Sequence, residues 1–170
     1  MLGWNLDNNI PKNIKKCVIV QAPHTSNWDF VIGKLAAYQF GIKPNIFIKK
    51  SLFFFPLGIL LKKLGGIPVD RSSRNNIVEE IAYQLTIQDE LLVLLTPEGT
   101  RSYNPNWKKG FYYIAKASRT PVIPAYIDFN KKRIGFTTEF ELTDDVNADI
   151  ETLKNYFRPF KGKYPENGIR

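Results

Sequence analysis

The sequence is poor in the residue types from which several kinds of functional site are built. It contains one cysteine, Cys17, and one histidine, His24, among 170 residues. A lone cysteine cannot form an intrachain disulfide, and its place in the apolar run CVIVQAP predicts a buried thiol in a reducing compartment. One histidine and one cysteine are too few for an ordinary zinc site, so we expect no metal. The Gly-x-Ser-x-Gly turn of many serine hydrolases is also missing.

Long apolar segments are absent as well. The most apolar run, SLFFFPLGILL at residues 51–61, has eleven residues, whereas about 20 are needed to cross a bilayer. This run can lie on a membrane but cannot span one. The first 16 residues mix turn formers with lysines and do not resemble a signal peptide. With only 23 residues before His24, we expect a cytoplasmic protein without an N-terminal pair of membrane helices.

Length and charge narrow the class of protein. A chain of 170 residues, 44% of them hydrophobic, suits one compact domain over residues 1–170. The net charge of +8 favours an anionic partner. Nucleic acid, a lipid surface and a phosphorylated small molecule all meet that requirement, so charge alone does not choose among them.

Short apolar runs alternate with segments of helical character. Strands are predicted at 16–22, 45–50, 91–96 and 120–127, followed by a later antiparallel strand within 131–142. Helices are predicted at 27–40, 53–64, 73–87 and 108–118, with a closing helix at 149–160. This alternation predicts an α/β fold with a mainly parallel, mixed central sheet and helices on both faces. The last ten residues are expected to fray.

The histidine lies in the segment QAPHTSNWDF, directly after the first predicted strand. Ligands of open α/β sheets usually bind at the carboxyl ends of strands. Because side chains five apart in a helix diverge by about 140°, His24 and Asp29 can pair only if the histidine is in the loop and the aspartate in the first helical turn. The carboxylate would then fix the imidazole tautomer and leave the other nitrogen to accept a proton. The alternative is a loop histidine beside a helix-capping aspartate.

Two other segments combine glycine with charged residues. In LLTPEGTRS, residues 94–102, Gly99 permits close backbone approach, Thr100 offers a hydroxyl, and the guanidinium of Arg101 suits phosphate oxygens. In LGGIPVDRSSR, residues 64–74, Arg71 follows paired glycines and a short extended piece. Each segment taken alone can also be an ordinary turn with exposed charges.

Taken in order, HTSNWD, GGIPVDR, PEGTRS and TPVIPAYI resemble the four sequence blocks of the glycerolipid acyltransferase family, which includes 1-acylglycerol-3-phosphate acyltransferase. The resemblance implies transfer of a fatty acyl group from acyl-CoA or acyl carrier protein to a hydroxyl of a lysophospholipid. It implies that His24 is the general base and Asp29 its partner. It further implies an acceptor site in which Arg71 binds the phosphate and the remaining contacts come from Glu98, Gly99, Thr100 and Arg101.

The chemistry of such a transfer suits these residue types. A hydroxyl is a poor nucleophile, and a positioned histidine base typically contributes about 10²- to 10⁴-fold. A thioester is already activated, so no covalent enzyme intermediate and no cofactor is required. Two alternatives remain: a family member that binds lipid or acyl chains without catalysis, and a basic nucleic-acid-binding domain. We recognise no nucleic-acid motif and do not expect nucleic acid as a partner.

Residues 49–66, KKSLFFFPLGILLKKLGG, suggest how a lipid is reached. Aromatic and aliphatic side chains lie here between two lysine pairs, Lys49 with Lys50 and Lys62 with Lys63. Such a segment can insert shallowly into an anionic bilayer, each lysine contributing about 1 kcal/mol. In the alternative reading, Phe53, Phe54, Leu57 and Leu61 belong to the core or line an acyl groove. The first reading predicts a protein that lies peripherally on the cytoplasmic face of the membrane.

A third lysine pair, Lys108 and Lys109, lies at the start of the helix predicted at 108–118. These lysines can extend an anion site toward the phosphate of the acceptor or those of the donor. They can equally be the solvated start of a basic helix.

Overall fold

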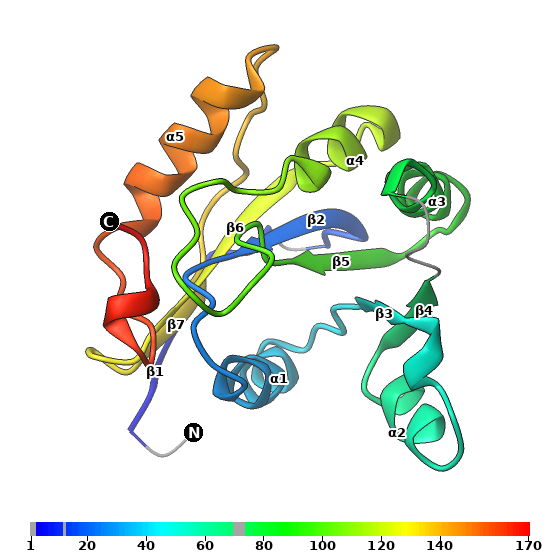
Figure 1. The fold of residues 1–170 in the computed structure, drawn as a ribbon, viewed down its shortest axis with the longest axis horizontal. Coiled ribbons are helices and arrows are strands. Elements are labelled where there is room, and N and C mark those ends of the chain that lie inside the picture. The colour runs from blue at the N-terminus through cyan, green and yellow to red at the C-terminus, as the bar shows by residue number, and fades with distance from the viewer. Residues whose placement is uncertain (1–2, 12, 70–73) are drawn as a thin grey trace.

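A central β-sheet carries helices on both of its faces (Figure 1). The computed structural model describes residues 3–11, 13–69 and 74–170. Its main sheet has five strands in the order β1-β7-β6-β2-β5, which are β1 (Asn5–Asn8), β7 (Arg133–Phe136), β6 (Val122–Asp128), β2 (Lys16–Gln21) and β5 (Leu91–Leu95). All neighbouring strands in it are parallel except β6 and β7. The predicted α/β fold with a mainly parallel, mixed sheet is confirmed.

A small parallel sheet of β3 (Ile46–Lys49) and β4 (Gly66–Val69) continues beside β5. Asn45 makes the connection, because its N–H donates to the carbonyl of Leu92 at 2.7 Å and its carbonyl accepts from the N–H of Leu94 at 2.8 Å. The 3₁₀ turn η1 (Lys50–Leu52) and the helix α2 (Leu57–Lys63) lie between the two strands. We call residues 50–65 the arm, since they project away from the main sheet (Figure 1).

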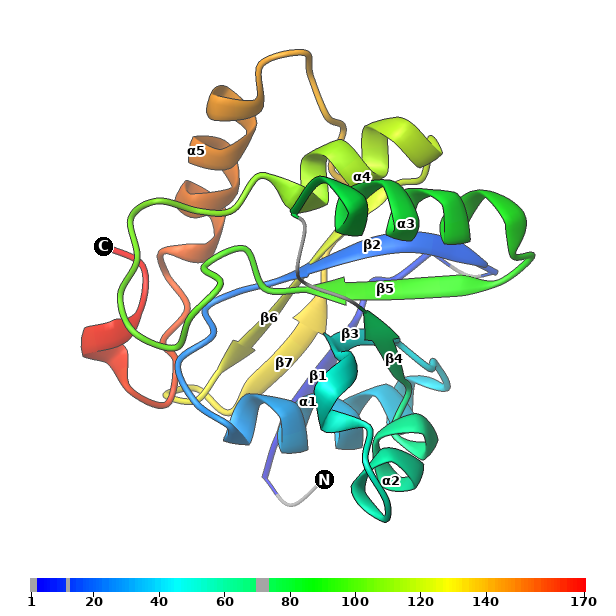
Figure 2. The ribbon, with the colours of Figure 1, turned by 45° about the vertical axis from the view of Figure 1, so that its right-hand side comes forward.

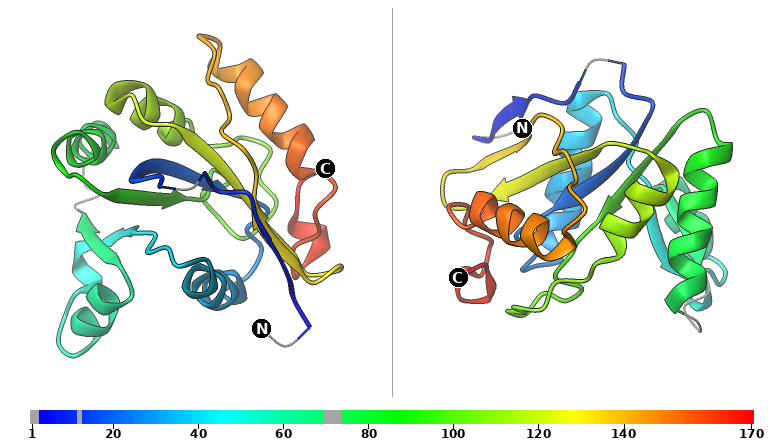
Figure 3. Two further views of the ribbon diagram at one scale, coloured as in Figure 1. Left: turned by 180° about the vertical axis from the view of Figure 1, so that it is seen from behind. Right: turned by 90° about the horizontal axis from the view of Figure 1, so that it is seen from above.

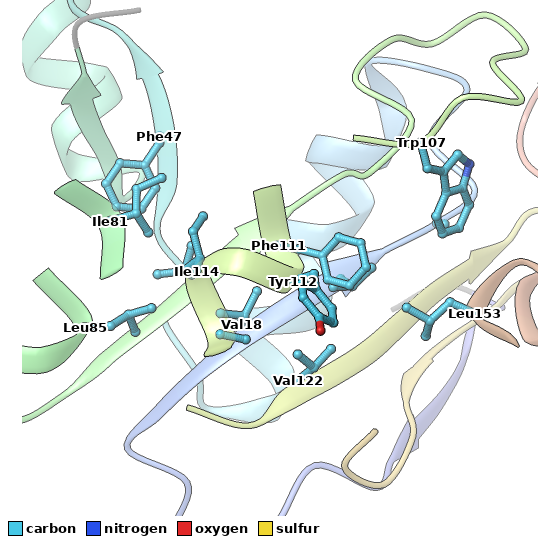
Figure 4. Close-up of a cluster of buried hydrophobic side chains, with 14 of the residues drawn as sticks. Val18, Phe47, Ile81, Leu85, Trp107, Phe111, Tyr112, Ile114, Val122 and Leu153 are labelled. Atoms are coloured by element: carbon cyan, nitrogen blue, oxygen red, sulfur yellow. The ribbon is translucent and has the colours of Figure 1, made fainter. Parts of the chain in front are cut away.

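The helices form two layers. On one face of the sheet lie α3 (Arg74–Ile87), α4 (Gly110–Ser118) and α5 (Val146–Phe157), and on the other lie α1 (Trp28–Phe40) and the arm (Figures 2 and 3). The larger hydrophobic core fills the space under the first layer (Figure 4). Val18 and Val122 of the sheet meet Leu85, Phe111 and Leu153 of the helices there.

Several boundaries differ from the sequence prediction. The helix predicted at 53–64 begins only at Leu57, because the preceding residues form η1 and a turn that ends in Pro56. The strand predicted within 131–142 is limited to β7, and beyond it Phe140 forms a single bridge to Val122. The closing helix begins earlier than predicted, at Val146, because the carboxylate of Asp145 caps it.

Both chain ends contain structure that the sequence pattern did not predict. The strand β1 was not anticipated. The last ten residues do not fray as expected: Pro165–Asn167 form a 3₁₀ turn, η2, and Gly162 and Gly168 are buried. Cys17 is fully buried, as predicted, and burial raises the pKa of its thiol to about 12.

The core makes a direct stability prediction on α3. Leu85 is fully buried, whereas Ile87, two residues further on, is 54% exposed. Leu85→Ala should lower the free energy of unfolding by about 2–5 kcal/mol because it leaves a cavity. Ile87→Ala should change that free energy by less than about 1 kcal/mol. Urea denaturation of both variants measures the difference, and equal losses would contradict the assigned packing of α3.

Candidate active site

The structure brings His24 and Asp29 together at the carboxyl end of β2. Asp29 lies in the first turn of α1, and its Oδ2 atom is 2.9 Å from Nδ1 of His24. The same oxygen accepts the backbone N–H groups of Thr25 at 2.9 Å and Ser26 at 3.0 Å. The Asp29 side chain is 1% exposed and that of His24 is 23% exposed. The loop before α1 is therefore folded around one buried carboxylate oxygen.

This contact determines what the imidazole can do. A hydrogen bond from Nδ1 to the carboxylate assigns the neutral tautomer with its proton on Nδ1. The Nε2 atom is then unprotonated and can accept a proton from a bound molecule. Asp29 would stabilise the imidazolium that results.

The loop after β5 meets the histidine loop, because β2 and β5 are parallel neighbours and both run toward the same edge. Glu98 in this loop accepts the backbone N–H of His24 through Oε1, at 2.8 Å. Asn104 donates to the backbone carbonyl of Glu98 at 2.7 Å and holds the loop in place. The resemblance places Glu98 in the acceptor site, whereas the structure shows that its side chain also binds the main chain of the histidine loop.

Glu98 is 5% exposed. Burial raises the pKa of its carboxyl to about 7, against the opposing effect of the hydrogen bond from His24. Its second oxygen, Oε2, is buried and has no hydrogen-bond partner among the described residues. A carboxyl of this kind exchanges its proton near neutral pH.

Three further residues of the PEGTRS motif, Gly99, Thr100 and Arg101, line the cavity beside the loop. Gly99 has φ +67°, in the left-handed region, and a Cβ atom there would lie 3.1 Å from Cγ of Lys108. This position therefore favours glycine, and the Lys108 side chain packs against the turn. The guanidinium of Arg101 donates to Oδ1 of Asn27, which lies outside the PEGTRS motif and has no functional signature in the sequence.

Two other predicted site residues are Lys109 and Arg71. Lys109 is exposed and directly precedes α4. Arg71 lies outside the described residues, so its role stays a prediction.

A cavity of about 830 Å³ opens beside the histidine, between α1, the sheet and the arm. Around its polar end are His24, Asn27, Asp29, Thr100 and Arg101, and its walls are mostly apolar. Those walls include Ala36, Ala37 and Phe40 of α1; Leu94, Ala125, Ile127 and Phe136 of the sheet; and Ile46, Ile48, Leu52 and Leu61 from β3 and the arm. Leu61 therefore lines a groove, one of the two alternatives for this segment, whereas Phe54 is 58% exposed.

Lys34 is a partly buried cation in the cavity wall that sequence patterns did not reveal. Its ammonium donates to the carbonyl of Pro44 at 3.1 Å and so connects α1 to the segment before β3. Burial lowers the pKa of this ammonium.

The C-terminal segment braces the histidine loop. The backbone N–H of Tyr164 donates to Oγ1 of Thr25 at 3.2 Å. Gly162 packs so closely that a Cβ atom there would overlap the Thr25 side chain. Lys163 lies over the ring of Trp28, with Nζ 4.5 Å from the ring centroid. A segment expected to fray thus supports the residue next to His24.

The chain belongs to the acyltransferase family, whose model, described as Acyltransferase, matches residues 5–128. This confirms the resemblance seen in the motifs. A 1-acyl-sn-glycerol-3-phosphate acyltransferase from Cocos nucifera is 33% identical over 82 residues, which make up 45% of this chain and 27% of the coconut protein. The chain thus spans about a quarter of the length of that relative.

The fold has a counterpart of known structure. The crystal structure of the 1-acyl-sn-glycerophosphate (LPA) acyltransferase PlsC from Thermotoga maritima superposes with a TM-score of 0.64 at 19% identity. The superposition covers 92% of this chain and 72% of that one. Within the part of our chain that the structure describes, no helix is both long and apolar enough to cross a bilayer.

The buried carboxyl of Glu98 makes stability depend on pH. Its pKa is about 7 in the folded protein against an ordinary value of 4.5, so the folded state binds more protons than the unfolded state between these values. Stability should therefore fall as the pH rises from about 5 to about 8, by up to about 3 kcal/mol from this group. Glu98→Gln should remove that part of the dependence. Urea denaturation at both pH values tests this, and parallel losses in the two proteins would contradict it.

Proposed function

We propose that this protein transfers a fatty acyl group from a phosphopantetheine thioester to a hydroxyl of a lysophospholipid such as 1-acylglycerol-3-phosphate. The thioester is that of acyl-CoA or acyl carrier protein. The observation that carries the proposal is the His24–Asp29 pair on the wall of a large, mostly apolar cavity. Membership of the acyltransferase family supports the same reaction class.

In the proposed reaction His24 acts as the general base. Nε2 takes the proton of the acceptor hydroxyl while the hydroxyl oxygen attacks the carbonyl carbon of the thioester. The C–S bond then breaks, and the leaving thiolate takes the proton back from the imidazolium. Asp29, which holds Nδ1, stabilises the positive charge on the ring between the two steps. The reaction requires no metal or cofactor, because the thioester is already activated.

Arg101 is the proposed ligand of the acceptor phosphate. It shares the polar end of the cavity with His24, and a guanidinium can donate two parallel hydrogen bonds to phosphate oxygens. Arg71 is proposed as a second ligand by family likeness, with Gly99 and Thr100 beside the acceptor. Lys108, which packs on Gly99, and Lys109 would add positive charge for the phosphates of acceptor or donor.

The apolar part of the cavity is proposed to hold the acyl chain. An acyl chain bound there would lie between α1 and the sheet, with its thioester end near His24. Removing the chain from water stabilises the bound state by roughly 25 cal/mol per Å² of apolar surface buried. That contribution would help to hold the thioester while the hydroxyl attacks.

His24→Ala should lower kcat for acyl transfer by about 10²- to 10⁴-fold because the base is lost. Asp29→Asn should lower kcat with little change in KM, since an amide cannot stabilise the imidazolium. Release of coenzyme A and formation of diacylated product measure transfer, with acyl-CoA and acyl carrier protein supplied separately. Circular dichroism shows whether the variants are folded. A folded His24→Ala enzyme with near-normal turnover would falsify the general-base role.

Arg101→Ala should raise KM for the lysophospholipid by about 10- to 100-fold, which corresponds to the loss of one or two hydrogen bonds to a charged group. The matched control is Arg158→Ala, an exposed arginine that follows α5, and it should leave KM unchanged. Asn27→Ala removes the internal partner of Arg101 and leaves the guanidinium in place. An unchanged acceptor KM in Arg101→Ala is the result that rules out phosphate binding.

A further inference from the structure

Hydrophobic side chains are exposed unevenly over the surface. Of sixteen exposed large hydrophobic side chains in the described part of the chain, ten lie between residues 28 and 60. Five of the other six are tyrosines, which carry a hydroxyl that water can solvate. The ten include leucine, isoleucine, valine, phenylalanine and tryptophan. An exposed hydrophobic patch of this kind marks an interaction surface.

The helix α1 supplies one part of this surface. Trp28, Val31, Leu35 and Tyr38 recur at i, i+3, i+7 and i+10 and therefore share one face of the helix. They are 51%, 43%, 50% and 81% exposed. Because the opposite face of α1 lines the cavity, the helix is hydrophobic on both sides. A helix with that pattern is normally buried on both sides.

The arm supplies the second part. Phe54 and Phe55 are 58% and 83% exposed at its turn, and Ile59 and Leu60 of α2 are each 53% exposed. Gly58 fixes this turn, since a Cβ atom there would lie 2.8 Å from the Phe53 carbonyl oxygen. The arm and α1 lie on the same side of the main sheet in every view (Figures 1, 2 and 3).

The charge around these side chains has one sign. Residues 30–69 contain six lysines and no aspartate or glutamate. They therefore carry six of the eight net positive charges of the whole chain. Lys49 and Lys50 lie at one end of the arm, and Lys62 and Lys63 at the other; all four are exposed. Hydrophobic side chains between lysines suit the boundary between acyl chains and anionic headgroups.

We propose that the outer face of α1 and the arm form one docking surface for an anionic lipid bilayer. Acidic partner proteins would match the lysines, but a bilayer also accepts the two exposed phenylalanines and the stripe on α1 without needing complementary pockets. The surface is continuous with the cavity, because Leu52 is 45% exposed and also lines the cavity wall. This inference goes beyond the proposed acyl transfer, since docking requires no chemistry at His24.

The test uses the full chain and vesicles of phosphatidylcholine with an equal part of phosphatidylglycerol, with bound protein measured by flotation. Ile59→Ser should weaken binding by about tenfold because a side chain leaves the acyl region. Ile87→Ser is the matched control, since Ile59 and Ile87 are 53% and 54% exposed, and it should bind like the wild type. Leu35→Ser tests the α1 part and should weaken binding to a similar extent.

The charge is tested in the same assay. Lys62→Gln/Lys63→Gln should weaken binding by roughly 30-fold, at about fivefold for each lysine. Its control, Arg119→Gln/Arg158→Gln, removes the same charge from the ends of α4 and α5 on the opposite face and should have a much smaller effect. Vesicles of phosphatidylcholine alone should bind weakly.

Three outcomes would overturn docking. The first is that the protein does not bind the mixed vesicles, and the second is that Ile59→Ser and Ile87→Ser weaken vesicle binding equally. The third is that sedimentation velocity shows a dimer which Ile59→Ser dissociates while vesicle binding is unaffected. The last would assign the surface to a second copy of the chain. The His24→Ala protein should bind vesicles like the wild type. Binding without transfer in the wild-type protein would therefore reject the proposed activity and leave the docking surface standing.

Discussion

A single carboxylate oxygen, Oδ2 of Asp29, holds the geometry on which the candidate site depends. It accepts hydrogen bonds from Nδ1 of His24 and from the backbone N–H groups of Thr25 and Ser26. Because two of these bonds are to the main chain, the same atom sets both the path of the loop and the orientation of the ring. It lies in the first turn of α1, where the helix dipole favours a negative charge.

Other parts of the fold keep this loop in place from two further directions. The parallel pairing of β2 with β5 brings Glu98 to the N–H of His24, and the segment before η2 brings Tyr164 to the hydroxyl of Thr25. Segments from three regions of the chain thus converge on three consecutive residues. Such a loop loses little conformational freedom when a substrate binds, because that freedom was already lost on folding.

Features that depend on local sequence pattern could be predicted from the sequence, whereas features that depend on distant contacts could not. The buried strands follow from their apolar runs. The His24–Asp29 pair was one of two arrangements that the local sequence allowed, and the resemblance to the acyltransferase blocks favoured it. The bond from His24 to Glu98 spans 74 residues and uses a backbone N–H, which has no signature in the sequence. The polar strand β1 pairs with β7 where Asp7 faces Gly135, and a Cβ atom on Gly135 would overlap Asp7.

The inner face of α1 has a consequence for substrate choice. Three of the α1 residues that line the cavity, Gly33, Ala36 and Ala37, have the smallest side chains. If an acyl chain occupies the cavity, the small side chains on this face of α1 leave room for it. A few methylene groups added to those side chains would shorten the longest acyl chain that fits. Selectivity for chain length could then diverge between relatives through changes on one helix face, while the groups that carry out the chemistry stay the same.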